Sequence, residues 1–109
     1  MSELFEEIAG MDKLIHEPAR LAILTALSVC KSADFTYLQR LTGLTQGNLS
    51  GHLGKLEEAA YLQITKQISG KRPLTTISIT PAGRQAIENH WAGLERLRDQ
   101  ARSWQPGDR

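Results

Sequence analysis

Two short groups of residues in this chain have the types and spacing that suit recognition of a nucleic acid. The first lies in a helix that the sequence predicts from Thr45 onward, where Gln46, Asn48 and Ser50 follow one another closely. Glutamine and asparagine can pair bidentately with adenine, and serine can hydrogen-bond to several bases. The second is the turn at residues 69–73, Ser-Gly-Lys-Arg-Pro, whose two basic side chains can enter a minor groove or meet phosphates.

The predicted helix has two contrasting faces when its residues are placed at steps of about 100°. An apolar stripe lies opposite a row of small residues, which has one lysine beside it. The stripe is Leu49, Leu53 and Leu56, and the opposite face is Gly47, Gly51, Gly54 and Lys55. Each glycine costs about 0.5–1 kcal/mol relative to alanine inside a helix. One interpretation is a helix of low intrinsic stability whose glycine face has no function. We favour the other, in which the missing bulk lets the backbone approach a groove, with DNA shape contributing to recognition.

Local signals predict two helices directly before this one. Pro18 suits the first turn of a helix that runs to about Cys30. Thr36 and Gln39 match a capping box that opens a short second helix, and Gly43 can end that helix in the left-handed conformation. Thr45 is then a good N-cap for the helix that carries the polar residues, with Leu44 and Leu49 as a hydrophobic staple.

A hairpin and a long helix are predicted after residue 61. Apolar and polar residues alternate from 62 to 68 and again from 75 to 79, on either side of the basic turn. Lys66 falls on the outer face of the first strand, where it can meet phosphate. Thr80 and Pro81 then open the last helix. The order predicts a winged helix-turn-helix: a mainly helical fold with a small β-hairpin and an additional helix at each end.

The composition fits one domain with an uneven charge. The chain has 109 residues, 13 basic and 12 acidic, for a net charge of +1, which is enough length to bury a single core. Residues 45–84 hold five bases against two acids, whereas residues 1–17 hold five acids against one base. The basic excess is therefore concentrated around the predicted recognition elements.

The sequence gives little support for a disulfide, a signal peptide or a membrane span. The one cysteine, Cys30, cannot form an internal disulfide and closes an apolar helical run, so we expect it in the core of a soluble, cytoplasmic protein. The start of the chain is acidic, which argues against a signal peptide, and no apolar run is long enough to span a bilayer. A sensor role for Cys30 in redox regulation stays open.

Neither the histidines nor any catalytic motif indicates a metal site or an enzyme. His16, His52 and His90 have no second ligand at metal-like spacing, so we expect no metal. We expect His52 to be half-buried at the helix flank or in contact with phosphate. No phosphate loop, nucleophile elbow or carboxylate pair appears. The sequence therefore predicts neither an enzyme nor a cofactor.

The combined motif resembles that of a known family. It reads Gly47-Asn48-Leu49-Ser50-x-His52-Leu53-x-x-Leu56-Glu57-x-Ala59-x-Tyr61, then Arg72-Pro73-x-Thr75, then Thr80-Pro81-x-Gly83-Arg84. This is similar to the winged-helix DNA-binding domain of small MarR/ArsR-like transcriptional regulators, over about residues 14–90. The resemblance implies sequence-specific binding of duplex DNA, usually by a homodimer, with the Thr45 helix in the major groove and the hairpin as a wing.

Two departures from the family pattern matter. Ala60 stands where these proteins usually carry a glycine in a left-handed conformation, which predicts a slightly altered exit from the helix. The cysteines and histidines of the metal-sensing ArsR branch are absent, so no metal effector is implied. A small-molecule effector stays open.

These observations lead to two sets of predicted contact residues. The predicted DNA contacts are Thr45, Gln46, Gly47, Asn48, Ser50, Gly51, Lys55, Lys66, Lys71 and Arg72. The terminal segments 1–15 and 81–104 carry apolar stripes beyond what the two-helix unit requires, which predicts dimerisation elements. Their predicted interface residues are Leu4, Ile8, Met11, Ile87, Trp91, Leu94, Leu97 and Trp104. The alternative hypothesis is a winged-helix module that docks onto proteins without binding DNA, and the near-neutral net charge keeps it open.

Overall fold

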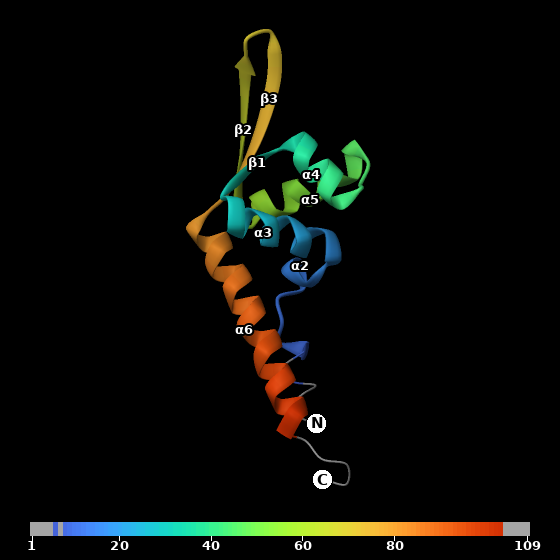
Figure 1. Ribbon diagram of the computed structural model, residues 1–109, viewed down its shortest axis with the longest axis vertical. Coiled ribbons are helices and arrows are strands. Elements are labelled where there is room, and N and C mark those ends of the chain that lie inside the picture. Colours follow the sequence, from blue (N-terminus) through green and yellow to red (C-terminus); the bar gives the residue numbers. More distant parts are fainter. Residues whose placement is uncertain (1–5, 7, 104–109) are drawn as a thin grey trace.

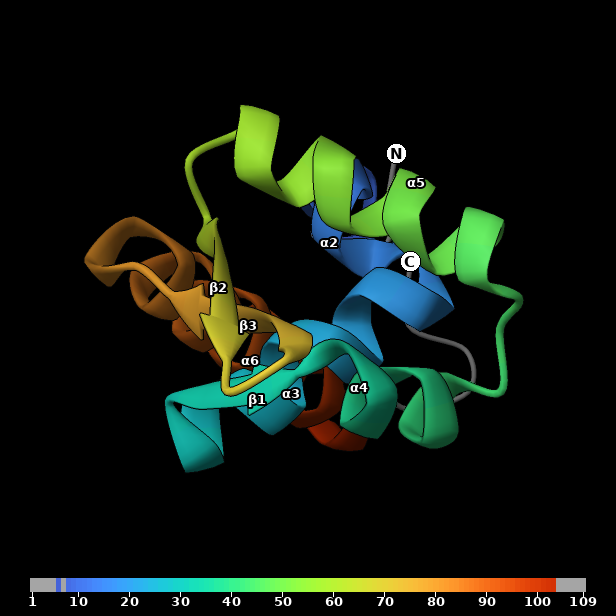
Figure 2. The same ribbon diagram turned by 90° about the horizontal axis from the view of Figure 1, so that it is seen from above.

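The computed structural model describes residue 6 and residues 8–103 of the chain. Its elements are α2 (Lys13–His16), α3 (Pro18–Cys30), β1 (Ser32–Asp34), α4 (Phe35–Thr42), α5 (Gln46–Glu58), β2 (Leu62–Ser69), β3 (Arg72–Ile79) and α6 (Pro81–Ser103). The hairpin and α6 project from opposite ends of a helical centre (Figure 1). Seen from above, α4 and α5 are arranged around the end of the hairpin (Figure 2). The predicted winged helix-turn-helix is confirmed.

The helix starts follow from side-chain caps. Glu17 caps α3 by accepting a hydrogen bond from the backbone N–H of Arg20, with Pro18 in the first turn. The expected capping box at Thr36 is wrong, because the Asp34 carboxylate accepts from the Tyr37 N–H at 2.7 Å. The N-cap therefore lies two residues earlier, and α4 begins at Phe35. An aspartate is as good an N-cap as threonine or better. Thr45 caps α5 as predicted, through the Asn48 N–H.

The exit from α5 keeps the left-handed geometry that the family pattern implies. Ala60 has a φ of +65°, and the Tyr61 N–H donates back to the Leu56 carbonyl at 3.0 Å. This six-to-one bond belongs to the Schellman motif, which normally has a glycine at the left-handed position. The expectation of an altered exit is therefore wrong. The alanine adopts the strained conformation, at a cost of about 1–2 kcal/mol.

The sheet has one strand more than the sequence predicted. All pairs are antiparallel in the order β1-β3-β2, and β1 pairs through only three residues, from Ser32↔Ser78 to Asp34↔Thr76. The β2–β3 hairpin, called the wing here, pairs from Leu62↔Ile79 to Ser69↔Arg72. Its loop is therefore Gly70-Lys71, shorter than the expected five-residue turn. Gly70 has a φ of +67°, which a two-residue loop with glycine first requires.

The core lies where α2, α3, α4, α5, the sheet and the first half of α6 meet. Its fully buried members include Leu24 and Leu27 of α3, Leu49 of α5 and Ile77 of β3. Ile87 of α6 is 0% exposed and belongs to this core, so its prediction as a dimer contact is wrong. The sequence stripe of α6 turns inward here because the first half of the helix packs on α3.

Cys30 does not lie in the core as expected. It is exposed, and its thiol donates to the Ala26 carbonyl at 3.1 Å. The neighbouring Val29 is 82% exposed, which shows that the last turn of α3 extends beyond the elements that cover the rest of this helix.

The junction between α5 and α6 is tightly packed. Thr80 donates its hydroxyl to the Ala60 carbonyl at 2.6 Å and its N–H to the Tyr61 carbonyl at 3.1 Å, and its hydroxyl also accepts from the Gly83 N–H. A Cβ at Gly83 would overlap the Tyr61 carbonyl. Only glycine therefore lets the start of α6 sit directly against the exit of α5.

The molecule is elongated. The radius of gyration is 17.1 Å, compared with about 13 Å for a compact chain of this length. The wing and the second half of α6 account for this shape (Figure 1). In the described part of the chain, no helix is both long enough and apolar enough to cross a membrane.

Candidate nucleic-acid interface

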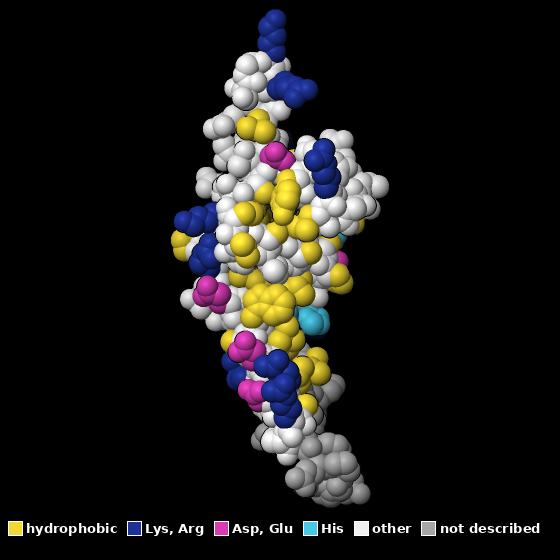
Figure 3. Space-filling model, viewed as in Figure 1, with side chains coloured by type: hydrophobic (Ala, Val, Ile, Leu, Met, Phe, Trp, Pro, Cys, Tyr) yellow, Lys and Arg dark blue, Asp and Glu magenta, His cyan; other side chains and the backbone are white. Residues whose placement is uncertain are grey.

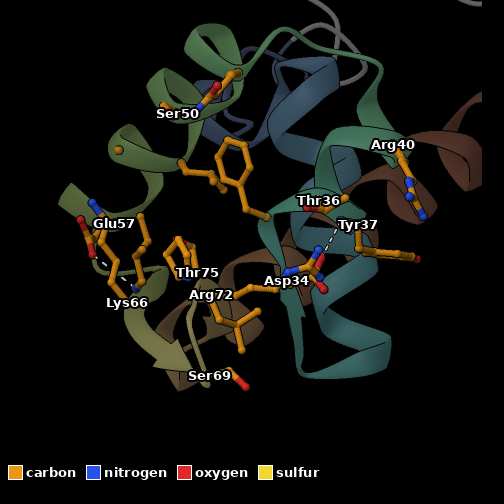
Figure 4. Close-up of a pocket in the computed structure, with 17 residues that line it drawn as sticks. Asp34, Thr36, Tyr37, Arg40, Ser50, Glu57, Lys66, Ser69, Arg72 and Thr75 are labelled. Carbon is orange, nitrogen blue, oxygen red and sulfur yellow. Dashed lines mark hydrogen bonds between the residues drawn. The ribbon is translucent and has the colours of Figure 1, made fainter.

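A cleft of about 1290 Å³ lies between α4, α5 and the wing. Its floor is apolar, with Phe35, Leu53 and Ile64, and its rim is polar. Figure 4 shows Ser50 at one side of this cleft, Tyr37 and Arg40 at another, and Lys66 and Arg72 at the wing. The fold thus brings together side chains from three elements that are separate in sequence.

Four of the predicted contacts share this cleft. Gln46 and Ser50 come from α5, and Lys66 and Arg72 come from the wing. All four are exposed. The side of α5 that carries Gln46 and Ser50 is called the wing-side flank below.

Helix α4 contributes residues that the sequence analysis missed. Thr36, Tyr37 and Arg40 line the cleft opposite the wing, and Tyr37 remains 48% exposed. The signal for them was present in the sequence: an arginine and a tyrosine three residues apart lie on one face of a helix. A basic side chain on α4 suits contact with a phosphate backbone that crosses the cleft.

Two carboxylates of the cleft are engaged by the backbone. Asp34 caps α4, and Glu57 accepts a hydrogen bond from the Ile64 N–H at 3.3 Å (Figure 4). These two acidic side chains therefore lie in the cleft because they stabilise the backbone there. The three basic residues, Arg40, Lys66 and Arg72, exceed these two acids.

The outward face of α5 is open. A Cβ built at Gly47, Gly51 or Gly54 would meet no described atom within 4 Å, and all three residues are exposed. None of them has a positive φ, so helix geometry does not require glycine there. The outward direction that the helical wheel predicted for them is confirmed.

The other predicted DNA contacts lie around this surface. Asn48 and Lys55 are exposed on the side of α5 that faces away from the cleft, with His52 one turn from each. This side is called the outer flank.

The remaining predicted residues lie in the wing loop and at the start of α5. Lys71 lies in the wing loop, and Figure 3 shows basic side chains at the wing tip. Thr45 is exposed, with its hydroxyl occupied as the cap. Arg84, counted with the basic excess in the sequence, instead donates to the Ser28 carbonyl.

A charged network joins the outer flank to the start of α3. Arg20 is only 9% exposed and places one guanidinium nitrogen, Nη1, 3.1 Å from His52 Nδ1. The Glu17 carboxylate lies 3.6 Å from the same ring nitrogen. Burial raises the pKa of Glu17, but hydrogen bonds from the Arg20 and Ala19 N–H groups and the charges of His52 and Arg20 bring it below its usual value. His52 is thus half-buried, as expected.

Apart from the buried Ile87, the predicted dimer residues fall into three groups. Trp91 and Ile8 are exposed, at 41% and 50%. Met11, Leu94 and Leu97 are partly buried. Leu4 and Trp104 lie outside the described residues.

A smaller hollow of about 410 Å³ lies where Glu6 and residues 10–12 meet α6. His90 lines it, is 5% exposed, and has no hydrogen-bond partner at either ring nitrogen among the described residues. Burial and the neighbouring His16 lower the pKa of His90, and Asp12 partly opposes them. Within the described chain, no three His, Cys, Asp or Glu side chains form a group that could hold a metal.

The fold and this surface define the class: a winged helix in which the exposed helix α5 and the basic hairpin lie on one side. Comparison with known proteins agrees. Residues 19–98 match the family described as "Winged helix DNA-binding domain", and the chain belongs to this family. Winged-helix domains of this class are typically not catalytic.

Three relatives give the family context. An uncharacterized protein of Methanocaldococcus jannaschii, MJ0432, is 37% identical over 78 residues, which cover 72% of this chain and 85% of that protein. A transcriptional regulator homologue from Pyrococcus horikoshii OT3 has a similar structure, with a TM-score of 0.83 and 29% identity, over 92% of this chain and 98% of that one. A MarR-family regulator from Silicibacter pomeroyi shares the fold at 21% identity, with a TM-score of 0.63 over 94% of this chain and 67% of that one. The expected winged-helix DNA-binding domain is confirmed, and its fold is shared with a MarR-family regulator.

Proposed function

We propose that this protein is a transcriptional regulator that binds duplex DNA sequence-specifically in the cytoplasm. Helix α5 enters the major groove, and the wing meets the adjacent minor groove or its phosphates. The observation that carries this proposal is the cleft, in which Gln46 and Ser50 of α5 share one surface with Lys66 and Arg72 of the wing. The uneven charge along the chain fits the same partner.

The contacts divide into two kinds. Gln46, Asn48 and Ser50 carry donors and acceptors suited to base edges, while Lys55 and Lys66 are suited to phosphate. The open glycines between the two flanks let the α5 backbone approach the groove. Replacing Gln46 by alanine is therefore expected to relax preference at one or two base positions, at a cost of about 1–3 kcal/mol there. An equal loss on all sequences would instead assign Gln46 to the DNA backbone.

We also propose that the active form is a homodimer joined through the terminal segments. Helix α6 has 23 residues, so it is about 34 Å long, and its second half extends beyond the core. Trp91 at the middle of α6 and Ile8 in the N-terminal segment leave apolar surface exposed. A second copy of the chain covers such a surface by two-fold symmetry and supplies the second recognition helix that a palindromic site requires.

Selection of bound sequences from a pool of random duplexes tests this function. We expect a palindromic consensus, and we expect its affinity to fall as salt rises, because bound phosphates release counterions. The matched control is an equal pool exposed to the Lys66→Ala, Arg72→Ala double variant. If neither enrichment nor a salt-dependent shift is found, the alternative of a protein-docking module holds. Repeating the selection with candidate small molecules tests for an effector.

A further inference from the structure

Arg20 stands out among the side chains outside the cleft because it is both charged and buried. It lies in the first turn of α3 and is 9% exposed. Its Nε donates to the Leu14 carbonyl at 2.6 Å, and its Nη1 lies 3.1 Å from His52 Nδ1. A buried guanidinium is costly unless its donors are satisfied. Here one of its partners is a histidine of α5, the helix proposed to enter the groove.

This contact determines which ring nitrogen of His52 carries the proton. A guanidinium has five N–H donors and no acceptor, so in a hydrogen bond between Arg20 and the neutral His52 ring the Nδ1 atom is the acceptor. In the neutral imidazole the proton then lies on Nε2. Arg20 thus selects the Nε2–H form of His52 and holds the ring in one orientation.

The Nε2 atom is the ring nitrogen that has no partner among the described residues, and it is not fully buried. The His52 side chain is 22% exposed. Its Nε2 is not among the buried, unpaired nitrogens of the described residues, and its only hydrogen bond within them is made by Nδ1. His52 lies between Asn48 and Lys55 on the outer flank of α5, one turn from each. The exposed N–H therefore lies in a row of groups that can donate to DNA.

We propose that His52 donates its Nε2–H to a phosphate of the operator and that Arg20 is the positioning residue that prepares this donor. The inference rests on the proposed function, since it adds a contact to the same duplex. The cleft holds the DNA strand on the wing side of α5, and His52 holds the strand on the other side. Glu17 accepts a hydrogen bond from the backbone N–H of Arg20, and the charge of Arg20 helps to lower the pKa of Glu17. The carboxylate thus offsets the guanidinium charge, and a neutral His52 adds a hydrogen bond without adding net charge.

Two substitutions separate the two ring nitrogens. In His52→Asn, the side-chain oxygen reaches about as far as Nδ1 and keeps an acceptor for Arg20, but the outward donor is lost. In His52→Gln, the amide N–H reaches about as far as Nε2. We expect His52→Asn to weaken binding to the operator and to an unrelated duplex alike, by about three- to tenfold, and His52→Gln to recover most of that loss.

The salt dependence identifies the contact as neutral. At pH 8, His52→Asn should leave the slope of log affinity against log salt unchanged, whereas Lys55→Ala should reduce it by about one. Full affinity in His52→Asn, or a loss confined to the operator sequence, would overturn the phosphate contact. If the unmodified protein binds no duplex at all, the proposed function fails instead.

The positioning role of Arg20 is tested by measuring which tautomer of His52 is present. Nitrogen NMR of the histidines in the full chain, with the His52 signals assigned by their loss in His52→Asn, should show the Nε2–H form alone. Arg20→Met should give a mixture of both forms, and Arg20→Lys should restore the single form. The DNA-binding losses of Arg20→Met and His52→Asn should not add in the double variant. An Nδ1–H form in the unmodified protein would overturn the positioning role, and this outcome can be observed even if Arg20→Met does not fold.

Discussion

Adding methyl groups to the outward face of α5 should stabilise the protein and impair its binding to DNA. The proposed change is Gly47→Ala, Gly51→Ala and Gly54→Ala together. The structure leaves open space at each added Cβ, and no glycine of the three has a positive φ. Alanine is favoured over glycine by about 0.8–1 kcal/mol per helix position. Since none of the three methyl groups meets a steric obstacle, the gains should add to about 2–3 kcal/mol.

The gain is large enough to measure by thermal or urea unfolding. For a domain of this size it corresponds to a rise in Tm of roughly 10–20 °C. DNA affinity, measured by fluorescence anisotropy on the selected operator, should move the other way. A methyl forced into a close-packed contact costs about 1–3 kcal/mol, so operator binding should weaken by about tenfold or more.

A matched control lies elsewhere in the same chain. Gly83→Ala adds the same methyl group, but there it would overlap the Tyr61 carbonyl, so this variant should lose stability. A triple variant that is more stable and still binds its operator normally would refute close approach of the α5 backbone. A triple variant that gains no stability would refute the estimated helix cost.

Three further predictions use other parts of the structure. Changing Lys71 and Arg72 to alanine should weaken binding to all duplexes and flatten the salt slope by about one to two; an unchanged slope in a folded variant removes the wing from the interface. Trp91→Glu with Leu94→Glu should give a folded monomer with much lower operator affinity, and sedimentation of the unmodified protein as a monomer at tens of micromolar would contradict the dimer. Because the pKa of buried His90 is lowered below about 6.5, the unfolded state takes up its proton first as pH falls, and stability should decline below that pH. His90→Leu should make that decline shallower in urea titrations from pH 7.5 to 5, and an equally steep decline would exclude His90 as its source.

Elements with a strong local signal were predictable from sequence. Pro18 fixed the start of α3, Thr45 the start of α5, and Gly43, with a φ of +69°, the end of α4. Each of these depends on one residue and its immediate neighbours. The alternating strands were predictable for the same reason. The outward direction of the glycines followed from three leucines on the opposite face of one helix.

Features that depend on distant parts of the chain were not predictable. Strand β1 has three residues and exists because β3 pairs with it. Two plausible caps, Asp34 and Thr36, compete within three residues, and local patterns alone do not choose between them. Ile87 belongs to an amphipathic stripe that faces the core at one end of α6 and leaves it at the other. The Arg20–His52 contact joins residues 32 positions apart, so no spacing rule indicated it.

The close approach at Gly83 fixes the position of α6 relative to α5. Hydrogen bonds among Ala60, Tyr61, Thr80 and Gly83 hold the two helices at a fixed angle. Over the roughly 34 Å length of α6, a change of about 5° at this joint would move its far end by about 3 Å. In a dimer joined through α6, that angle determines the distance between the two α5 helices. The number of base pairs between the operator half-sites would then depend on a glycine that does not itself lie on the DNA-facing surface.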